Sequence, residues 1–143
     1  MILTIHSFGA DNELFKLAMK VRFEVFTKEQ GIDKNIEFDG LDFEAVHYLI
    51  MADNKPIAAA RWRETADGLK IERLAVIKEY RSLGIGTMLL KIIISELKKA
   101  KKQIYLHAQT YLQKYYECHG FKPVGEKFME ANIEHIKMIY SQN

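Results

Sequence analysis

Apolar residues recur along this chain with two different periods, and the changes of period predict its helices and strands. A spacing of three or four residues marks helices, and alternation or a short apolar run marks strands. In chain order the pattern predicts a strand at 2–6, a helix after Asn12 that continues to Gly31, a loop at 32–45, strands at 47–51, 57–64 and 69–76, a helix at 86–102, a strand at 103–108, a short helix at 111–119 that Thr110 caps, and strands at 121–128 and 135–141.

Turn residues indicate how the middle strands connect. The stretches ADNKP (52–56) and ADG (66–68) join three successive strands and predict an antiparallel meander. The later helices lie between successive strands, as in βαβ units. We therefore expect one α/β (α+β) domain, residues 1–143, with a mixed sheet and helices on its faces.

Composition narrows the class of protein. The chain has 143 residues, 48% of them hydrophobic, which predicts a packed core. A net charge of +2 argues weakly against a nucleic-acid binder, and the lysines in KKAKK (98–102) are expected to be a solvated helix end. One cysteine, Cys118, excludes an internal disulfide. No apolar run predicts a membrane span and no secretory leader is recognisable, so a cytoplasmic protein is expected.

The stretch RSLGIG (81–86) stands where a strand changes into a helix. A helix start offers unpaired amides and a partial positive charge, and glycines let an anion approach the backbone. Arg81 adds donors suited to phosphate. The dinucleotide fingerprint fails because Leu89 occupies its third glycine position, and no P-loop string occurs. The pattern alone leaves a phosphate site and an ordinary tight turn both open.

RSLGIG together with a second segment gives the chain a resemblance to the GNAT superfamily of N-acetyltransferases. RSLGIG is similar to its acyl-CoA pyrophosphate loop, and QTYLQKYYECHGF (109–121) is similar to its Asn-x-x-Ala-x-x-aromatic-Tyr-x-x-x-Gly-Phe segment. Gln109 and Leu112 depart from the usual Asn and Ala. VRFEVFTKEQGI, EFDGLDFEAVHYLI and ANIEHIKMI resemble the ElaA-like and YjcF-like bacterial branch, so the resemblance spans nearly the whole chain.

The resemblance implies a GNAT fold, with a splayed cleft between the strands at 69–76 and 103–108, and direct acetyl transfer from acetyl-CoA to an amine. It implies that the pantetheine arm and the diphosphate contact a run of backbone and side-chain groups. These are Leu74, Ala75, Val76, Arg81, Ser82, Leu83, Gly84, Ile85, Gly86, Thr87, Gln109 and Tyr116.

The chemistry requires an acid for the CoA thiolate and a route for the proton of the amine. The resemblance gives the acid role to Tyr116, the alternative being that this tyrosine only packs the short helix. Glu72 shares a strand face with apolar neighbours, which suits a base with a raised pKa. An ion pair between Glu72 and an arginine of RWR (61–63) is the equal alternative, and a bulge in the strand would redirect the carboxylate.

The amine acceptor is where the sequence says least. Arg22, Glu29 and Gln30 lie in the region that lines the acceptor side in the family, and His107 lies on a strand beside the cleft. Histidine spacing predicts no metal site. A small amine is favoured as the acceptor. An acyl-CoA-binding regulatory module with little turnover is the alternative function, and the sequence leaves open whether the chain forms a homodimer.

Overall fold

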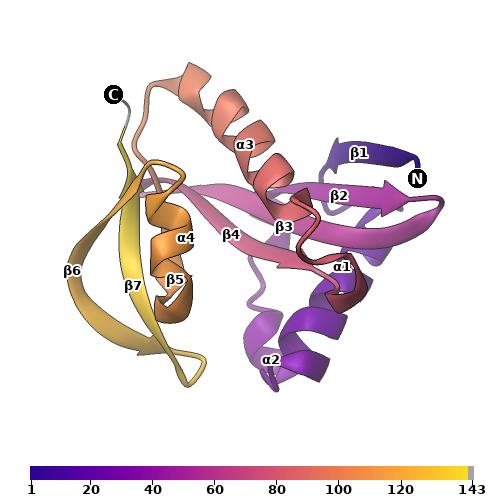
Figure 1. The fold of residues 1–143 in the computed structure, drawn as a ribbon, viewed down its shortest axis with the longest axis horizontal. Coiled ribbons are helices and arrows are strands. Elements are labelled where there is room, and N and C mark those ends of the chain that lie inside the picture. Colours follow the sequence, from indigo (N-terminus) through magenta and orange to yellow (C-terminus); the bar gives the residue numbers. More distant parts are fainter. Residues whose placement is uncertain (142–143) are drawn as a thin grey trace.

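A seven-stranded mixed sheet organises residues 1–141, the part of the chain that the computed structural model describes (Figure 1). Its strands lie in the order β1-β2-β3-β4-β5-β7-β6. Their bounds are β1 Leu3–Phe8, β2 Val46–Ala52, β3 Lys55–Thr65, β4 Gly68–Val76, β5 Ile104–Gln109, β6 Phe121–Glu130 and β7 Ile133–Tyr140. Among these strands β4 and β5 pair in parallel and all other pairs are antiparallel, which confirms the predicted mixed sheet.

The predicted meander is present as β2, β3 and β4. Asp53 and Asn54 form the first turn with φ angles of 47° and 69°. Both angles belong to the left-handed region that a two-residue hairpin turn requires and that Asn and Asp tolerate. The chemistry of these two residues therefore fixes the register of β2 against β3.

The predicted helices are present, and the structure adds a π-helical segment and several short helical turns that were not predicted. The helix predicted up to Gly31 is α1, Phe15–Arg22, which continues into a π-helical segment, Phe23–Glu29. The predicted loop at 32–45 contains α2, Lys34–Glu37, and a 3-10 turn, Asp42–Glu44. The other helices are α3 Ile85–Leu97 and α4 Gln113–Glu117, and further 3-10 turns lie at Lys78–Tyr80, Lys98–Ala100 and Thr110–Leu112.

Thr110 does not cap the short helix as expected. It lies inside the 3-10 turn that precedes α4, and its hydroxyl donates to Glu134 Oε1 of β7 at 2.9 Å. The side chain therefore ties the turn to the sheet instead of to the helix amides.

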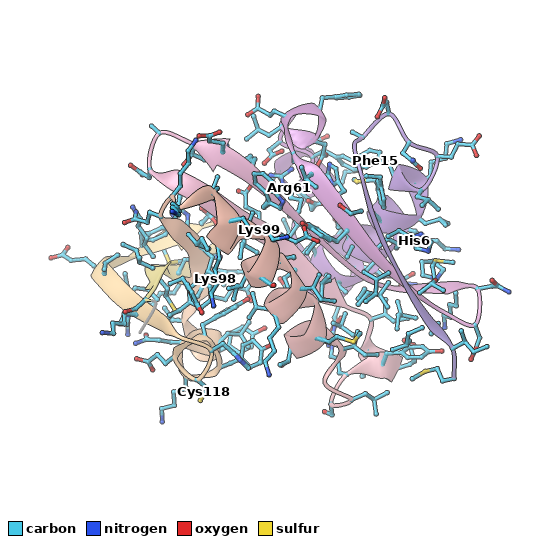
Figure 2. The ribbon with its side chains drawn as sticks, turned by 90° about the horizontal axis from the view of Figure 1, so that it is seen from above. His6, Phe15, Arg61, Lys98, Lys99 and Cys118 are labelled. Atoms are coloured by element: carbon cyan, nitrogen blue, oxygen red, sulfur yellow. The ribbon has the colours of Figure 1, made fainter. Side chains whose placement is uncertain are left out.

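Both faces of the centre of the sheet are covered. Residues 57–61 of β3 are buried without a break, and successive strand residues point to opposite faces. Helix α1 packs against β2 and β3, and α3 packs against β3 and β4. Arg61 lies within these layers, whereas Lys98, Lys99 and Cys118 are exposed at the ends of α3 and α4 (Figure 2).

Candidate functional site

The two parallel strands at the middle of the sheet separate soon after they meet. Pairing between β4 and β5 is limited to Leu69 with Ile104 and Lys70 with Tyr105. Beyond that level a cleft of about 360 Å³ opens between them. Six residues singled out from the sequence line it, namely Gln30, Glu72, Leu74, His107, Gln109 and Tyr116.

A bulge in β4 shapes one side of this cleft. The register of β4 against β3 shifts by one residue between Ala59 and Arg61, and Arg73 has a φ of 57°. Left-handed backbone is costly for a residue with a side chain, so the surroundings must hold it. Arg73 Nε donates to Glu37 Oε2 at 2.6 Å, and its Nη2 donates to Asp39 Oδ2 at 3.2 Å.

Glu72, directly before the bulge, is enclosed by cations. Its carboxylate lies 2.6 Å from Arg63 Nε, 3.1 Å from Arg61 Nη2 and 3.1 Å from Lys70 Nζ. Burial favours the neutral carboxyl, but the hydrogen bond from Arg63 and the charges of Arg61 and Lys70 outweigh it and lower the pKa of Glu72. The expected raised pKa is therefore wrong, and the alternative ion pair with the RWR arginines is present.

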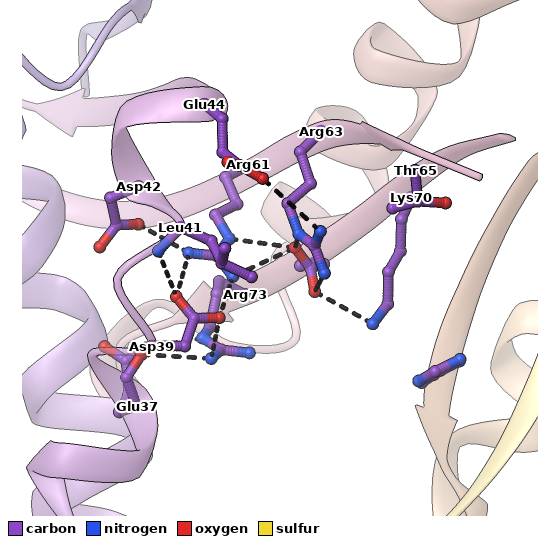
Figure 3. A network of polar contacts seen from close by, with 12 residues as sticks. Glu37, Asp39, Leu41, Asp42, Glu44, Arg61, Arg63, Thr65, Lys70 and Arg73 are labelled. Atoms are coloured by element: carbon purple, nitrogen blue, oxygen red, sulfur yellow. Dashed lines mark hydrogen bonds and ion pairs between the residues drawn. The ribbon is translucent and has the colours of Figure 1, made fainter. Parts of the chain in front are cut away.

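The ion pairs of Glu72 belong to a larger buried network (Figure 3). Arg61 is fully buried and donates to Asp39 and Asp42 as well as to Glu72. Arg22 is 1% exposed and donates to Glu37 and Asp42. Six members of the network line the cleft, and we call the four that come from β3 and β4, Arg63, Lys70, Glu72 and Arg73, the arginine wall.

The network corrects the proposed role of Arg22. This guanidinium was expected among the residues that contact the acceptor. It is buried behind the cleft, its hydrogen-bonding nitrogens are occupied by carboxylates, and it does not line the cavity. Arg22 therefore supports Glu37 and Asp42 from behind the cleft.

The glycine turn before α3 presents free backbone amides. Ser82 and Gly84 have φ angles of 66° and 77°, and the first α-helical bond of the segment runs from the Met88 amide to the Gly84 carbonyl. Within the described chain, the amides from Leu83 to Thr87 have no backbone partner. A Cβ on Gly84 would meet no atom within 4 Å, so the turn is open on that side.

Arg81 does not project into this turn. Its Nε donates to the Val76 carbonyl at 2.9 Å, and both terminal nitrogens donate to Glu29, at 2.5 Å for the pair Nη2 and Oε1. Glu29 ends the π-helical segment and does not line the cleft. The pair therefore links the first helix to the loop, and Glu29, expected on the acceptor side, lies at the loop instead.

Two neighbouring tyrosines of α4 have different surroundings. The Tyr115 hydroxyl shares a hydrogen bond of 2.8 Å with Thr87 Oγ1 in the first turn of α3. Tyr116 lines the cleft, is 8% exposed and packs edge-on against Tyr115 and Phe121. Burial raises the pKa of Tyr116, so its hydroxyl keeps its proton over the neutral range.

Comparisons with known proteins agree with this geometry. The model of the acetyltransferase (GNAT) domain family matches residues 17–142. The chain belongs to the GNAT acetyltransferase family.

Relatives and solved structures place the chain within that family. It is 37% identical to the uncharacterised N-acetyltransferase YjcF of Bacillus subtilis over 90% of this chain and 94% of YjcF. It is 31% identical to ElaA of Escherichia coli over 93% of this chain and 90% of ElaA. An acyl-CoA N-acyltransferase from Pseudomonas aeruginosa superposes with a TM-score of 0.89, at 28% identity, over 98% of this chain and all of that one. The predicted ElaA-like and YjcF-like branch is confirmed.

A more distant GNAT structure carries a ligand. The family member from Elizabethkingia anophelis, with acetyl-CoA bound, superposes with a TM-score of 0.65 at 21% identity, covering 96% of this chain and 94% of its own. This likeness shows the shared fold. The chain is thus an acetyltransferase by family, with a single GNAT-type mixed sheet.

The opposite side of the GNAT cleft carries a second cluster of titratable groups. His107 Nδ1 lies 3.2 Å from Glu130 Oε1, and His135 Nε2 lies 3.6 Å from Glu130 Oε2. All three residues line the cleft. We call them the histidine wall. Gln109 of the same side donates to Gln30 Oε1 at 3.0 Å, so the unusual glutamine has a protein partner here.

Glu130 and His135 are the functional candidates that the sequence did not reveal. They flank the β6–β7 turn, where Ala131 and Asn132 have φ angles of 52° and 62°. The sequence pattern that could have indicated them is a carboxylate and an imidazole on either side of the turn between the last two predicted strands. It becomes informative only once β7 is known to lie between β5 and β6, because that order brings both residues next to His107.

Residues 1–141 contain no group of three or more His, Cys, Asp or Glu side chains placed to hold a metal ion. None of the helices in that range is long and apolar enough to span a membrane.

Proposed function

We propose that the protein transfers an acetyl group from acetyl-CoA directly to a primary amine. The observation that carries the proposal is the separation of β4 from β5 beside the glycine turn of α3, which joins a cleft to a set of free amides. The acetyl-CoA bound by the Elizabethkingia neighbour supports the choice of co-substrate.

In this proposal the turn from Arg81 to Thr87 holds the diphosphate of CoA. The free amides from Leu83 to Thr87 supply donors, and the partial positive charge at the start of α3 favours an anion. Gly86 brings the helix close to β4, since a Cβ there would lie 3.4 Å from Val76 Cγ2. Ser82 and Ile85 contribute through their backbone, while the side chain of Arg81 fixes the turn to Glu29 and Val76.

The edge of β4 beyond Lys70 is proposed to bind the pantetheine arm. Its partner β5 has diverged there, so the backbone groups of Leu74, Ala75 and Val76 that face the gap lack a strand partner on that side. An extended amide-containing ligand can take the place of a missing strand. A backbone N–H near Val76 would also lie close to the thioester oxygen, where negative charge develops.

Tyr116 is proposed as the acid that protonates the departing thiolate. Its hydroxyl stays protonated because burial raises its pKa, and it lines the cleft where the thioester would lie. A phenol held in place can donate its proton as the carbon–sulfur bond breaks. Glu72, as an ionised and ion-paired carboxylate, is a weak base, so we propose for it only a role through a bound water.

The acceptor is proposed to be a small amine that enters beside Gln30 and His107, both of which line the cleft. We also propose a cytoplasmic setting, because the exposed Cys118 thiol suits a reducing compartment. The proposal includes neither nucleic acid nor membrane as a partner, and it leaves the oligomeric state to measurement.

The test is release of CoA from acetyl-CoA across a broad panel of primary amines, together with a thermal-shift titration with CoA. We expect a rise of the unfolding midpoint with CoA, because a ligand of the native state stabilises it, and turnover with at least one amine. A midpoint shift without turnover on any amine would support the regulatory module instead. No midpoint shift at all would contradict both.

A further inference from the structure

The histidine wall has the layout of a base with its orienting group. The Nδ1 atom of His107 faces the Glu130 carboxylate at 3.2 Å. A carboxylate accepts hydrogen bonds, so Nδ1 carries the hydrogen and Nε2 keeps the lone pair of the neutral imidazole. Within residues 1–141 no hydrogen bond to Nε2 is formed, and the side chain lines the cleft.

The neighbours of this imidazole hold it in place. The ring of His107 packs edge-on against Phe128 at 4.9 Å between centroids and lies 5.9 Å from the ring of Tyr105. His135 lies beside Glu130: its Nδ1 donates to the Ile133 carbonyl at 2.7 Å, and its Nε2 lies 3.6 Å from Glu130 Oε2, where the ring attracts the carboxylate only in its protonated form. The hydrogen bond from His107 lowers the pKa of Glu130, so the carboxylate stays ionised.

Two lysines on the adjacent strands lie on the same side of the sheet as His107 but have other partners. Lys137 of β7 pairs with His107 in register, but its ammonium lies over the Tyr105 ring and 3.5 Å from Asp67. Lys70 of β4 lies 3.1 Å from Glu72. Both ammonium groups are thus engaged with other residues, whereas the Glu130 carboxylate contacts the imidazole directly.

Glu72 and His107 occupy matching levels on the two walls. Each follows the last paired level, Lys70 with Tyr105, by two residues. The carboxylate of Glu72 accepts from three cations, but the Nε2 atom of His107 is unengaged. Of these two groups, only His107 has a free lone pair to offer an acceptor.

We propose that His107 is the general base of the acetyl transfer and that Glu130 is a positioning residue that acts through it. The proposal rests on the N-acetyltransferase function proposed above. Nε2 takes one proton from the acceptor ammonium, directly or through one water. The lone pair thus freed on the amine nitrogen attacks the thioester carbon, the carbon–sulfur bond breaks, and Tyr116 protonates the thiolate. The second amine proton restores Tyr116, and the imidazolium releases its proton to solvent.

The test is the pH dependence of kcat/KM, from about pH 5.5 to pH 9.5, with an amine that the wild type accepts. Protonation of Nε2 removes the lone pair that the base needs, so we expect the wild-type rate to fall on the acidic side of the profile. His107→Gln should lower kcat/KM about 100-fold and remove this acidic limb. Glu130→Gln should lower it about tenfold and move the limb to lower pH, because the imidazolium loses its anion.

Three controls separate this role from a structural one. Glu72→Gln should keep the acidic limb, and His6→Gln, which changes a half-buried histidine of β1 that bonds to Thr4, should leave rate and profile unchanged. The CoA affinity of His107→Gln should match wild type within about twofold. Added imidazole should partly restore the rate of His107→Ala, which a packing defect would not allow.

The outcomes distinguish the two proposals. A wild type that acetylates an amine while His107→Gln keeps its rate and its acidic limb overturns the base assignment and leaves the proposed function standing. A wild type that acetylates no amine overturns both. Nitrogen-15 NMR of the CoA-bound protein adds a readout without turnover, since a hydrogen on Nε2 of neutral His107 would contradict the assignment.

Discussion

The two walls of the cleft carry similar groups in opposite states of pairing. On the arginine wall one carboxylate, Glu72, meets three cations, and all of these charges are fixed by ion pairs. On the histidine wall one carboxylate, Glu130, meets two imidazoles whose charge depends on pH. A fully paired cluster holds its geometry but has no proton acceptor to offer. The partly paired cluster of the histidine wall leaves the lone pair of His107 Nε2 free to accept a proton.

This difference also separates what stabilises the molecule from what would act on a substrate. The carboxylates of Glu37, Asp39 and Asp42 bridge the 32–45 segment to β3 and to the bulge in β4. They hold Arg73 in its left-handed conformation and so set the shape of the cleft. The histidine wall spans β5, β7 and the edge strand β6, and its carboxylate Glu130 is 44% exposed, so a change of charge there costs less.

The largest expected effect comes from breaking the arginine side at its centre. Arg61→Met removes a fully buried cation that serves Asp39, Asp42 and Glu72. Removing one partner of a buried ionic network leaves unpaired charge, so we expect a loss of about 3–5 kcal/mol in the free energy of unfolding, measured by urea denaturation.

An exposed ion pair provides the control for Arg61→Met. Lys102→Ala breaks a pair with Glu64 in which both side chains are about half exposed, and it should cost less than about 1 kcal/mol. Similar losses in the two variants would mean that burial of the network contributes little to stability.

The next effect concerns the two tyrosines of α4. Tyr116→Phe removes a hydroxyl that lines the cleft, and we expect kcat to fall by about 100-fold with CoA affinity unchanged. Tyr115→Phe removes a hydroxyl that bonds to Thr87 and should lower kcat by less than about threefold. The measurements are steady-state kinetics and CoA titration of both variants. If Tyr116→Phe lost CoA affinity instead of rate, the hydroxyl would serve binding.

How far the sequence predicts this molecule differs between the fold and the site. The meander, the crossover through α3 and the glycine turn follow from local patterns, because turn residues and periodicity act over a few positions. The resemblance of segments 81–86 and 109–121 to those of the GNAT family predicts the roles of the glycine turn and of Tyr116. The π-helical segment at Phe23–Glu29 and the two helical turns within 32–45 were missed, since their residues show no distinct periodicity.

The site was harder because its electrostatics are non-local. Glu72 seemed suited to a raised pKa from its apolar strand neighbours, but its partners Arg61 and Arg63 come from β3 and the bulge re-aims its strand. Arg22 belongs to the network only because the 32–45 segment folds back over it. Contacts between residues far apart in sequence decide these charges, and one sequence alone does not show them.

A smaller effect tests the glycine turn by itself. Gly84 and Gly125 have φ angles of 77° and 75°, and a Cβ at either position meets no atom within 4 Å. Alanine at either position should therefore cost about the same, roughly 1–2 kcal/mol, from left-handed backbone alone. Only Gly84→Ala should also weaken CoA binding, by about tenfold, since its methyl group occupies the side from which the diphosphate would approach. Equal CoA affinities in the two variants, measured by calorimetry, would contradict a role of the glycine turn in binding the diphosphate of CoA.

The smallest effect is the acid dependence of stability, which again separates the two walls. Burial favours the neutral form of Asp39, but bonds from Arg61 and the Leu41 amide, with the charges of Arg61 and Arg73, lower its pKa from 3.8 to about 2. The unfolded chain therefore binds more protons in that range, so this stabilisation is present above about pH 4 and is lost as pH falls toward 2. Urea midpoints between pH 5 and pH 2.5 should fall less steeply in Arg73→Gln, which lacks one of these charges, than in wild type. Glu130→Gln should flatten the slope less than Arg73→Gln does, because solvent screens the lowered pKa of this 44% exposed carboxylate. A larger flattening in Glu130→Gln than in Arg73→Gln would place the acid-sensitive stability on the histidine wall and reverse the assignment of the two sides.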